Sequence, residues 1–202
     1  MTKQEIAPGI LVHNDVMPGE IFDTLVNDIE EGMASARIEW IAAHVQEGDN
    51  PEGNVNTKTR DTSTISVPYS STPLNNYSDL LSSFHTSLSN IFLEHLVPLE
   101  KSYQQHYGVP CMWHDSYQIL KYGVGQKFVN HIDDHADHHR RVSTLYYLND
   151  NYSGGEITFP RFGISFKPKA NQMVIFPSNF VFNHSVLPVT EGVRYSVVSW
   201  LR

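Results

Sequence analysis

The second half of the chain is a succession of short β-prone segments separated by turn residues, and this pattern restricts the possible folds more than any other feature of the sequence. From Ser116 onward the segments are SYQILKY, FVNHID, VSTLYYL, EITF, GISFKP, MVIF and VRYSVVSWL. Such runs at regular spacing are typical of a sandwich or barrel of antiparallel strands. Residues 151–155 are predicted to form a turn. Residues 169–171 are predicted to close a hairpin in which Asn171 adopts the left-handed conformation.

The first half has a helical pattern. Residues 10–12 predict one early strand, Pro18 and Gly19 open a helix, and a second helix is expected over residues 76–107, kinked or split at Pro98. The apolar faces of these helices are formed by Ile21, Leu25, Ile29 and Met33 in the first and by Leu81, Phe84, Leu88, Ile91 and Phe92 in the second. Residues 47–64 are polar and are interpreted as a surface loop, either a plain connector or a lid over a substrate site.

Length and composition predict one domain. The chain has 202 residues, of which 40% are hydrophobic, enough for a full core. Residues 1–202 are expected to form a single domain that is mainly β with an α elaboration. Within it, residues 1–115 are interpreted as a helical support region and residues 116–202 as the β-core that carries all the site motifs.

Charge and cysteine usage narrow the partners and the compartment. The formal net charge of -8 argues against nucleic acid and anionic membranes as partners, because both repel an acidic surface. Cys111 is the single cysteine, so no intrachain disulfide is possible, and a reducing, cytoplasmic compartment is expected. The N-terminus has no long apolar run, which predicts neither a signal peptide nor a membrane span.

Two histidines and a carboxylate in the β-rich half suggest a metal site. Residues i and i+2 of an extended chain point to the same face, so His131 and Asp133 can converge on one ion, and His184 follows later in the same core. Two histidines and one carboxylate form the facial triad of non-haem Fe(II) oxygenases, which leaves positions open for a keto acid and O₂. Two alternatives are a solvated polar loop and adventitious binding of Zn or Ni. Both alternatives stay open because the same segment contains further polar, metal-binding side chains: His135, Asp137, His138 and His139.

An arginine ten positions after His184 suggests an anion site. In the strand VRYSVVSWL, Arg194 and Ser196 share a face, and an inward arginine needs a carboxylate. The distal carboxylate of 2-oxoglutarate would serve, with Ser196 as an added hydroxyl donor. A structural salt bridge or an outward-facing arginine is the alternative. Tyr122 and Tyr147 are further candidates for that carboxylate, and core packing is the alternative for both.

With these residues in place, the second half resembles the prolyl 4-hydroxylase branch of the Fe(II)/2-oxoglutarate dioxygenases, including the animal oxygen-sensing prolyl hydroxylases. The matching stretches are LKYGVGQKFVNHID, RRVSTLYYLND, YSGGEITFP, FKPKANQMVIFPS and NHSVLPVTEGVRYSVVSWL. They run in family order from about Ser116 to the C-terminus. Collagen-type members carry lysine at the position of Arg194, whereas oxygen-sensing members carry arginine. Many members have a tyrosine at the position of Phe128.

The resemblance implies a double-stranded β-helix (jelly-roll) core flanked by N-terminal helices. It implies that the iron ligands are His131, Asp133 and His184, and that the 2-oxoglutarate residues are Arg194 and Tyr147, with Tyr122 and Trp200 nearby. It also implies hydroxylation of a C–H bond of peptidyl proline, using O₂ and releasing succinate and CO₂, with ascorbate as reductant. Arg140 and Arg141 are candidate substrate contacts or, alternatively, exposed edge charges.

Three other functions stay open. The first is a dioxygenase of a free amino acid or another small molecule. The second is a non-catalytic jelly-roll sensor that binds metal and 2-oxoglutarate. The third is a structural jelly roll such as a capsid or lectin domain, which gives no reason for His131, Asp133, His184 and Arg194 to occur together.

Overall fold

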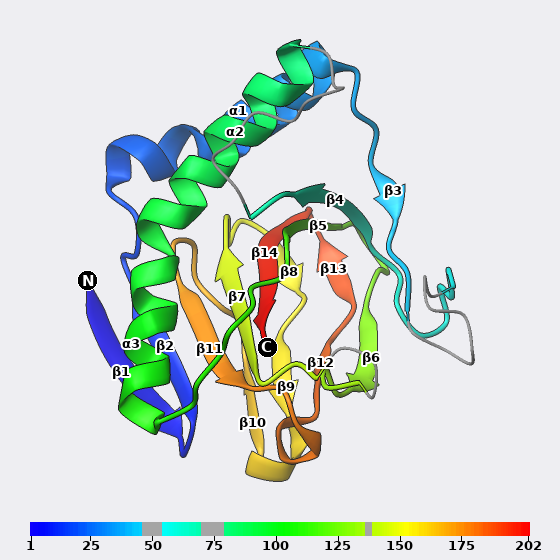
Figure 1. Cartoon of the computed structure of the whole chain (residues 1–202). Helices are drawn as coiled ribbons and strands as arrows, with labels where there is room; N and C mark the ends of the chain where they lie inside the picture. The colour runs from blue at the N-terminus through cyan, green and yellow to red at the C-terminus, as the bar shows by residue number, and fades with distance from the viewer. Residues whose placement is uncertain (46–53, 70–78, 136–138) are drawn as a thin grey trace.

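The computed structural model describes residues 1–45, 54–69, 79–135 and 139–202, which form two facing β-sheets with helices packed on the outer side of one of them (Figure 1). The helices are α1 (Gly19–Ala36), α2 (Asp79–His95) and α3 (Val97–Tyr107). The strands are β1 (Thr2–Ala7), β2 (Ile10–Asn14), β3 (Ile41–Ala42), β4 (Ser63–Val67), β5 (Tyr117–Tyr122), β6 (Phe128–His131), β7 (Val142–Tyr147), β8 (Ser153–Gly154), β9 (Ile157–Phe159), β10 (Ile164–Phe166), β11 (Met173–Pro177), β12 (His184–Val186), β13 (Val189–Glu191) and β14 (Arg194–Leu201). Short 3-10 helices span Pro160–Phe162 and Phe180–Phe182.

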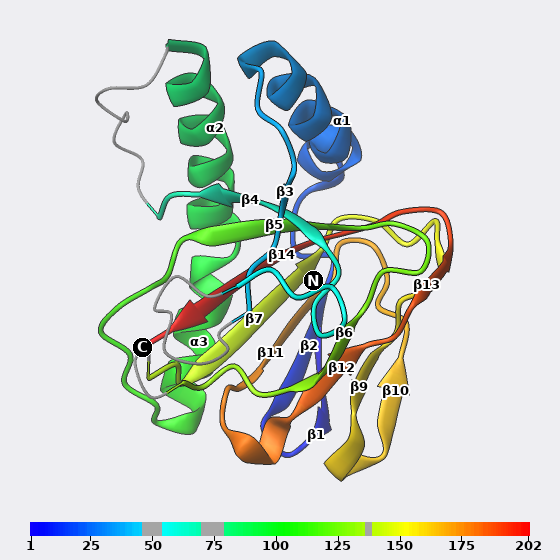
Figure 2. The same cartoon turned by 90° about the vertical axis from the view of Figure 1, so that its right-hand side faces the viewer.

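The two main sheets are antiparallel and face each other. The larger sheet has eight strands in the order β1-β2-β11-β7-β14-β5-β4-β3, and the smaller has four in the order β10-β9-β12-β6. Figure 2 shows the smaller sheet standing against the central strands of the larger one. A two-stranded pair, β13-β8, lies beside them. The predicted jelly-roll core is confirmed.

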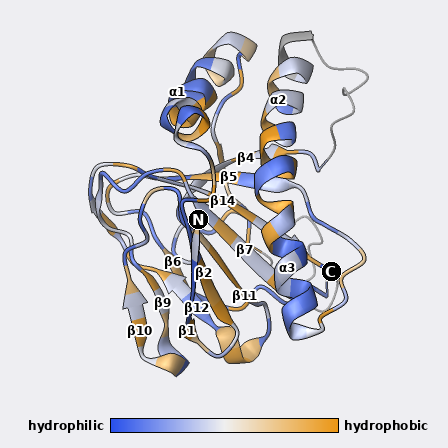
Figure 3. Cartoon of the chain, turned by 90° about the vertical axis from the view of Figure 1, so that its left-hand side faces the viewer, coloured by the Kyte–Doolittle hydropathy of each residue, from blue (hydrophilic) through white to orange (hydrophobic). Residues whose placement is uncertain are grey.

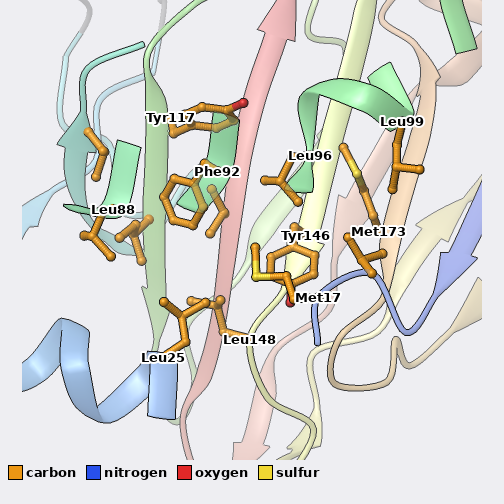
Figure 4. Close-up of a cluster of buried hydrophobic side chains, with 14 of the residues drawn as sticks. Met17, Leu25, Leu88, Phe92, Leu96, Leu99, Tyr117, Tyr146, Leu148 and Met173 are labelled. Atoms are coloured by element: carbon orange, nitrogen blue, oxygen red, sulfur yellow. The ribbon is translucent and has the colours of Figure 1, made fainter. Parts of the chain in front are cut away.

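The sheets are held by two hydrophobic cores, one on each face of the large sheet. The first core lies between that sheet and the helices (Figure 4), and its labelled members are Met17, Leu25, Leu88, Phe92, Leu96, Leu99, Tyr117, Tyr146, Leu148 and Met173. The second core lies between the two sheets and includes Leu145, Tyr147, Phe159, Phe176 and Trp200. In Figure 3 hydrophobic colouring runs along β11, whereas α3 carries hydrophilic positions on its outer side. Each core draws on one face of the strands because successive side chains alternate.

The alternation along β14 determines where the functional groups point. Tyr195, Val197 and Leu201 pack into the first core, beneath the helices. The other face consists of Arg194, Ser196, Val198 and Trp200, all of them buried. This shared face was predicted from the sequence. It lies between the sheets, where a charged side chain requires a partner.

The helices follow the predicted pattern. α1 buries Leu25, Ile29 and Met33 at helical spacing, and its last residue is followed by the capping residue Arg37, which has a positive φ of 53°. The long second helix is split at Leu96, and Pro98 lies in the first turn of α3, where its missing N–H is tolerated. The side chain of Leu81, predicted for the apolar face, lies outside the described residues. Among the helices the structure describes, none combines the length and apolarity of a membrane span.

Three features differ from the predictions. The first 115 residues are not only helical, since they supply β1, β2, β3 and β4 to the large sheet. Part of the predicted loop over residues 47–64 lies outside the described residues, and its last two positions, Ser63 and Thr64, open β4. A single domain over residues 1–202 stays a prediction.

The third difference is the connection at residues 169–171, which is not a hairpin. β10 pairs with β9 in the small sheet, whereas β11 pairs with β2 and β7 in the large one. The reason is that Met173 and Ile175 pack into one core and Val174 and Phe176 into the other, so β11 needs a central position. Asn171 does adopt the predicted positive φ, at 61°.

Candidate active site

The small sheet brings the predicted metal ligands together. His131 ends β6, His184 begins β12, and the two residues are directly paired across these antiparallel strands. Asp133 follows β6 by two residues. One ligand atom from each of the three lies within 4.8 Å of the others, the only such group among the residues that the structure describes. Of the alternative ligands, Asp137 and His138 lie outside the described residues, and His135 and His139 are not part of the group.

Backbone carbonyls orient both imidazoles. His131 Nδ1 lies 2.8 Å from the carbonyl oxygen of Val129, and His184 Nδ1 lies 3.2 Å from that of Phe182. Because a carbonyl only accepts, each Nδ1 carries the proton and donates it. In the neutral imidazole Nε2 then keeps its lone pair, and the two Nε2 atoms lie 3.5 and 3.6 Å from the Asp133 carboxylate. This is the tautomer that a metal ligand requires.

The carboxylate of Asp133 accepts a hydrogen bond from a residue of the large sheet. Ser143 Oγ donates to Asp133 Oδ2 at 2.7 Å and lies 2.8 Å from Ser178 Oγ. Burial opposes ionisation, but the imidazoles of His184 and His131 and the Ser143 hydroxyl hold the pKa of Asp133 well below its usual range. The group is therefore an anion at neutral pH, despite being buried.

His184 is neutral over the same pH range. Burial, reinforced by the neighbouring His131, lowers the pKa of His184 to about 4. Two imidazoles and one carboxylate give the set of donors that suits Fe(II) in the facial triad. The residues present therefore fit a divalent ion.

Arg194 lies deeper between the sheets and is fully buried, with 0% of its surface exposed. Its Nη1 donates to Ser196 Oγ at 3.2 Å, while Nε and Nη2 have no hydrogen-bond partner. The guanidinium carbon lies 4.9 Å from the ring of Tyr122 and 5.0 Å from that of Tyr147. Among the described carboxylates none forms an ion pair with it, so the alternative of a structural salt bridge fails there.

The unpaired groups around Arg194 fit the distal carboxylate of a dicarboxylic keto acid. The hydroxyl of Tyr147 is buried and has no partner, like two of the guanidinium nitrogens. Unpaired buried donors are rare in folded proteins, and several around one buried cation indicate an anionic ligand. One pocket contains both this arginine and the metal ligands. Its lining residues are Arg60, Leu120, Tyr122, Phe128, His131, Asp133, Leu145, His184, Val186, Arg194, Val198 and Trp200.

Sequence reasoning missed three residues at or near this pocket, namely Tyr152, Gly155 and Arg60. Tyr152 is 4% exposed, and its hydroxyl has no hydrogen-bond partner among the described residues. Burial raises the pKa of Tyr152, and the nearby Arg194 cation partly opposes that shift. Gly155 makes room for both, since a Cβ there would lie 3.1 Å from Arg194 Cδ and from Tyr152 Cε2. The SGG sequence after Tyr152 was the available signal. No sequence signal pointed to Arg60 as a pocket residue, because it lies in the polar segment over residues 47–64 that was interpreted as a loop.

The remaining predicted residues differ in their placement. Trp200 lines the pocket, and the Arg140 guanidinium stacks on it, 3.6 Å from the ring centre. Arg140 is therefore not the exposed edge charge of the alternative interpretation. Arg141 is exposed and its Nη1 donates to the Pro110 carbonyl at 3.3 Å, outside the pocket lining.

Comparison with known proteins agrees with this geometry. Residues 117–202 match the profile of the 2OG-Fe(II) oxygenase superfamily. A probable prolyl 4-hydroxylase 9 of Arabidopsis thaliana is 28% identical over 123 residues, which cover 46% of this chain and 43% of the relative. The prolyl 4-hydroxylase subunit alpha-1 of Gallus gallus is 30% identical over 102 residues, covering 42% of this chain and 20% of the relative. The chain thus spans less than half the length of either relative.

Solved structures share the fold. A Pseudomonas putida prolyl-4-hydroxylase superposes with a TM-score of 0.68 at 21% identity, covering 96% of this chain and 92% of the other. A prolyl hydroxylase from Trichoplax adhaerens, solved with a hypoxia inducible factor peptide fragment, gives 0.71 at 16% identity, with 96% and 83% covered. At such identities the likeness establishes a common fold.

Proposed function

We propose that this chain, whose residues 117–202 match the profile of the 2OG-Fe(II) oxygenase superfamily, is an Fe(II)- and 2-oxoglutarate-dependent dioxygenase that hydroxylates a C–H bond of peptidyl proline. The observation that carries the proposal is the presence, in one pocket, of the His131, Asp133 and His184 group and the buried, unpaired Arg194. No partner among the described residues explains either feature as a structural element of the fold. Together they match one divalent ion and one dicarboxylic keto acid.

Each residue has a definite role in the proposed site. His131, Asp133 and His184 hold the metal, which supplies O₂ activation coupled to decarboxylation of 2-oxoglutarate to succinate and CO₂. Ser143 fixes the carboxylate of Asp133 through its 2.7 Å hydrogen bond.

The cosubstrate is held at its far end by the large sheet. Arg194 and the Tyr147 hydroxyl bind the distal carboxylate, and the hydroxyl of Ser196 orients the guanidinium at 3.2 Å. Tyr122 supports the same cation through its ring, and Trp200 lines the pocket beside it. Apolar side chains complete the walls and exclude water from the reacting groups. They are Leu120, Leu145, Val186 and Val198.

A peptide substrate is supported by the relatives. The Arabidopsis and Gallus relatives are named prolyl 4-hydroxylases, and the Trichoplax prolyl hydroxylase was solved with a peptide fragment. We extend this to a proline-containing peptide or protein partner, with ascorbate as reductant. The cytoplasm is the proposed compartment, because Cys111 has no cysteine with which to pair.

The proposal is tested by aerobic incubation with Fe(II), ascorbate, 2-oxoglutarate and a pool of proline-containing peptides, following succinate and peptide mass together. Succinate with one oxygen added to a proline is the expected result. Succinate without peptide modification would reject the peptide substrate and favour a free amino acid or other small molecule. Binding of 2-oxoglutarate without succinate under any condition would favour a non-catalytic sensor module.

A further inference from the structure

Arg60 brings a positive charge into the pocket that no described carboxylate neutralises. Its Nη1 donates to the carbonyl of His44 at 2.9 Å and its Nη2 to Gln118 Oε1 at 3.5 Å, both neutral acceptors, while its buried Nε has no partner. The guanidinium lies 5.1 Å above the ring of Phe128, which in turn stacks on the metal ligand His131 at 3.5 Å. The adjacent carboxylate, Asp61, instead accepts a hydrogen bond from Gln126.

Arg140 adds a second cation close to the same region. Its guanidinium covers Trp200, a lining residue of the pocket, and its Nε lies 3.3 Å from Asp115 Oδ2. Asp115 is shared, because its other oxygen pairs with Arg202 at 2.7 Å. Arg60 and Arg140 flank one pocket, because Arg60, Phe128 and Trp200 all line it and Arg140 covers Trp200. Burial lowers the pKa of Arg140, the carboxylates of Asp133 and Asp115 raise it, and Arg60 adds a smaller repulsion.

The loaded site would therefore carry excess positive charge on its substrate side. The divalent ion and Arg194 are balanced by Asp133 and the two carboxylates of 2-oxoglutarate. Beside this neutral group, Arg140 and Arg202 share the carboxylate of Asp115, and Arg60 forms no ion pair with a carboxylate of the described residues. The whole chain has a formal net charge of -8, so a local positive excess stands out against its surroundings.

We infer that the substrate presents a carboxylate to Arg60 and Arg140, next to the C–H bond that is hydroxylated. The inference rests on the proposed dioxygenase function and specifies its substrate class. The planar guanidinium forks suit a carboxylate, and an acidic group there would satisfy the free Nε of Arg60 or replace its weak 3.5 Å contact with Gln118. Two sources supply this chemistry: an aspartate or glutamate side chain beside a peptidyl proline, or the α-carboxylate of a C-terminal or free amino acid.

The test uses matched substrates that differ in one carboxylate. Peptides with Glu or Gln on either side of proline probe a side-chain carboxylate, and peptides ending in proline acid or proline amide, together with free proline, probe an α-carboxylate. Oxygen incorporation is measured with the Fe(II) enzyme. Binding is measured separately under anaerobic conditions, on protein loaded with Mn(II) and 2-oxoglutarate. Wild type is compared with Arg60→Gln, Arg140→Gln and the charge-retaining Arg60→Lys.

Arg141→Gln is the matched control, because Arg141 is the neighbouring arginine and lies outside the pocket lining. We expect acidic substrates to be preferred over their amide partners by about tenfold or more, as for a charge-assisted contact at a partly desolvated site. The preference should fall to near unity in Arg60→Gln and Arg140→Gln, survive in part in Arg60→Lys and be unchanged in Arg141→Gln. Circular dichroism and thermal unfolding of the Arg60 and Arg140 variants, compared with Arg141→Gln, show whether they still fold.

The outcomes separate the inference from the function on which it rests. Equal hydroxylation or binding of acid and amide partners by wild type would overturn the inference and leave the dioxygenase intact. An acid preference that survives both Arg60→Gln and Arg140→Gln would overturn it as well. If no succinate forms in any mixture, the proposed function fails, and the anaerobic binding comparison still decides whether these arginines select a carboxylate.

Discussion

Replacement of Arg194 by methionine should separate the binding role of this residue from its effect on stability. In the structure its guanidinium is fully buried, with Nε and Nη2 unpaired and the rings of Tyr122 and Tyr147 at 4.9 and 5.0 Å. A structural arginine of this kind would stabilise the fold. An arginine kept for an anionic cosubstrate should instead destabilise the protein when that cosubstrate is absent.

Arg194→Met is expected to raise the stability of the cosubstrate-free protein and to lower its affinity for 2-oxoglutarate. Each unpaired buried donor costs about 1–3 kcal/mol, and each cation–π contact returns about 0.5–2 kcal/mol. Arg194→Met should therefore stabilise the cosubstrate-free protein by about 1–2 kcal/mol, which raises Tm by roughly 2–8 °C for a chain of this size. Loss of a buried, charge-assisted contact with the distal carboxylate costs about 2–5 kcal/mol, so 2-oxoglutarate affinity should fall by about 30-fold to several thousand-fold.

Both effects can be read in one assay, thermal unfolding of wild type, Arg194→Met and the exposed control Arg141→Met, with and without Mn(II) and 2-oxoglutarate. We expect Arg194→Met to unfold at a higher temperature than wild type when free and to show no shift with 2-oxoglutarate. Arg141→Met should behave like wild type. A destabilised Arg194→Met that still responds to 2-oxoglutarate would refute the reasoning, because it would make Arg194 a structural residue.

Three further predictions concern the surroundings of these groups. Ser143→Ala removes the 2.7 Å hydrogen bond to Asp133 and should weaken Mn(II) affinity by about 10- to 100-fold in a metal titration, with the fold retained by circular dichroism. Gly155→Ala places a methyl group 3.1 Å from Arg194 Cδ at a φ of +66°, so it should lower the free energy of unfolding by about 1–3 kcal/mol in denaturant melts and reduce 2-oxoglutarate affinity. Burial lowers the pKa of His184 to about 4, below the roughly 6.5 of an unfolded imidazole, so the unfolded chain takes up a proton that the folded, metal-free chain refuses. Its free energy of unfolding should therefore fall by up to about 3 kcal/mol between pH 7 and pH 4, and His184→Asn should flatten that slope.

Much of the fold and the metal site was predictable because local patterns carried the information. The β-prone segments after Ser116 all contain strands, and the β14 alternation put Arg194 on the inner face as expected. The candidate metal group was suggested by the two-residue spacing of His131 and Asp133, although β6 ends at His131 and Asp133 lies just beyond it. His184 was harder to place by pattern alone, since its partnership with His131 depends on the pairing of β12 with β6.

What sequence reasoning missed depends on contacts between distant segments. A turn signal at residues 169–171 does not reveal whether the flanking strands pair, and the two hydrophobic faces of β11 decide that they do not. Arg60 reaches the pocket because residues 54–62 run beside β5 and β6, through the pairing of Arg60 with Phe128. Tyr152 is brought to Arg194 by the positive-φ glycines 154 and 155, whose effect on side-chain direction requires the folded geometry.

The central claim is that His131, Asp133 and His184 hold the ion that drives oxidation of 2-oxoglutarate. The most direct measurement is release of the C1 carboxyl of 2-oxoglutarate as CO₂, in wild type, Asp133→Ala and the matched variant of the next carboxylate, Asp134→Ala, each supplied with Fe(II) and O₂. We predict release by wild type and Asp134→Ala, and none by Asp133→Ala or by wild type without iron. Equal release by Asp133→Ala and wild type would contradict the account.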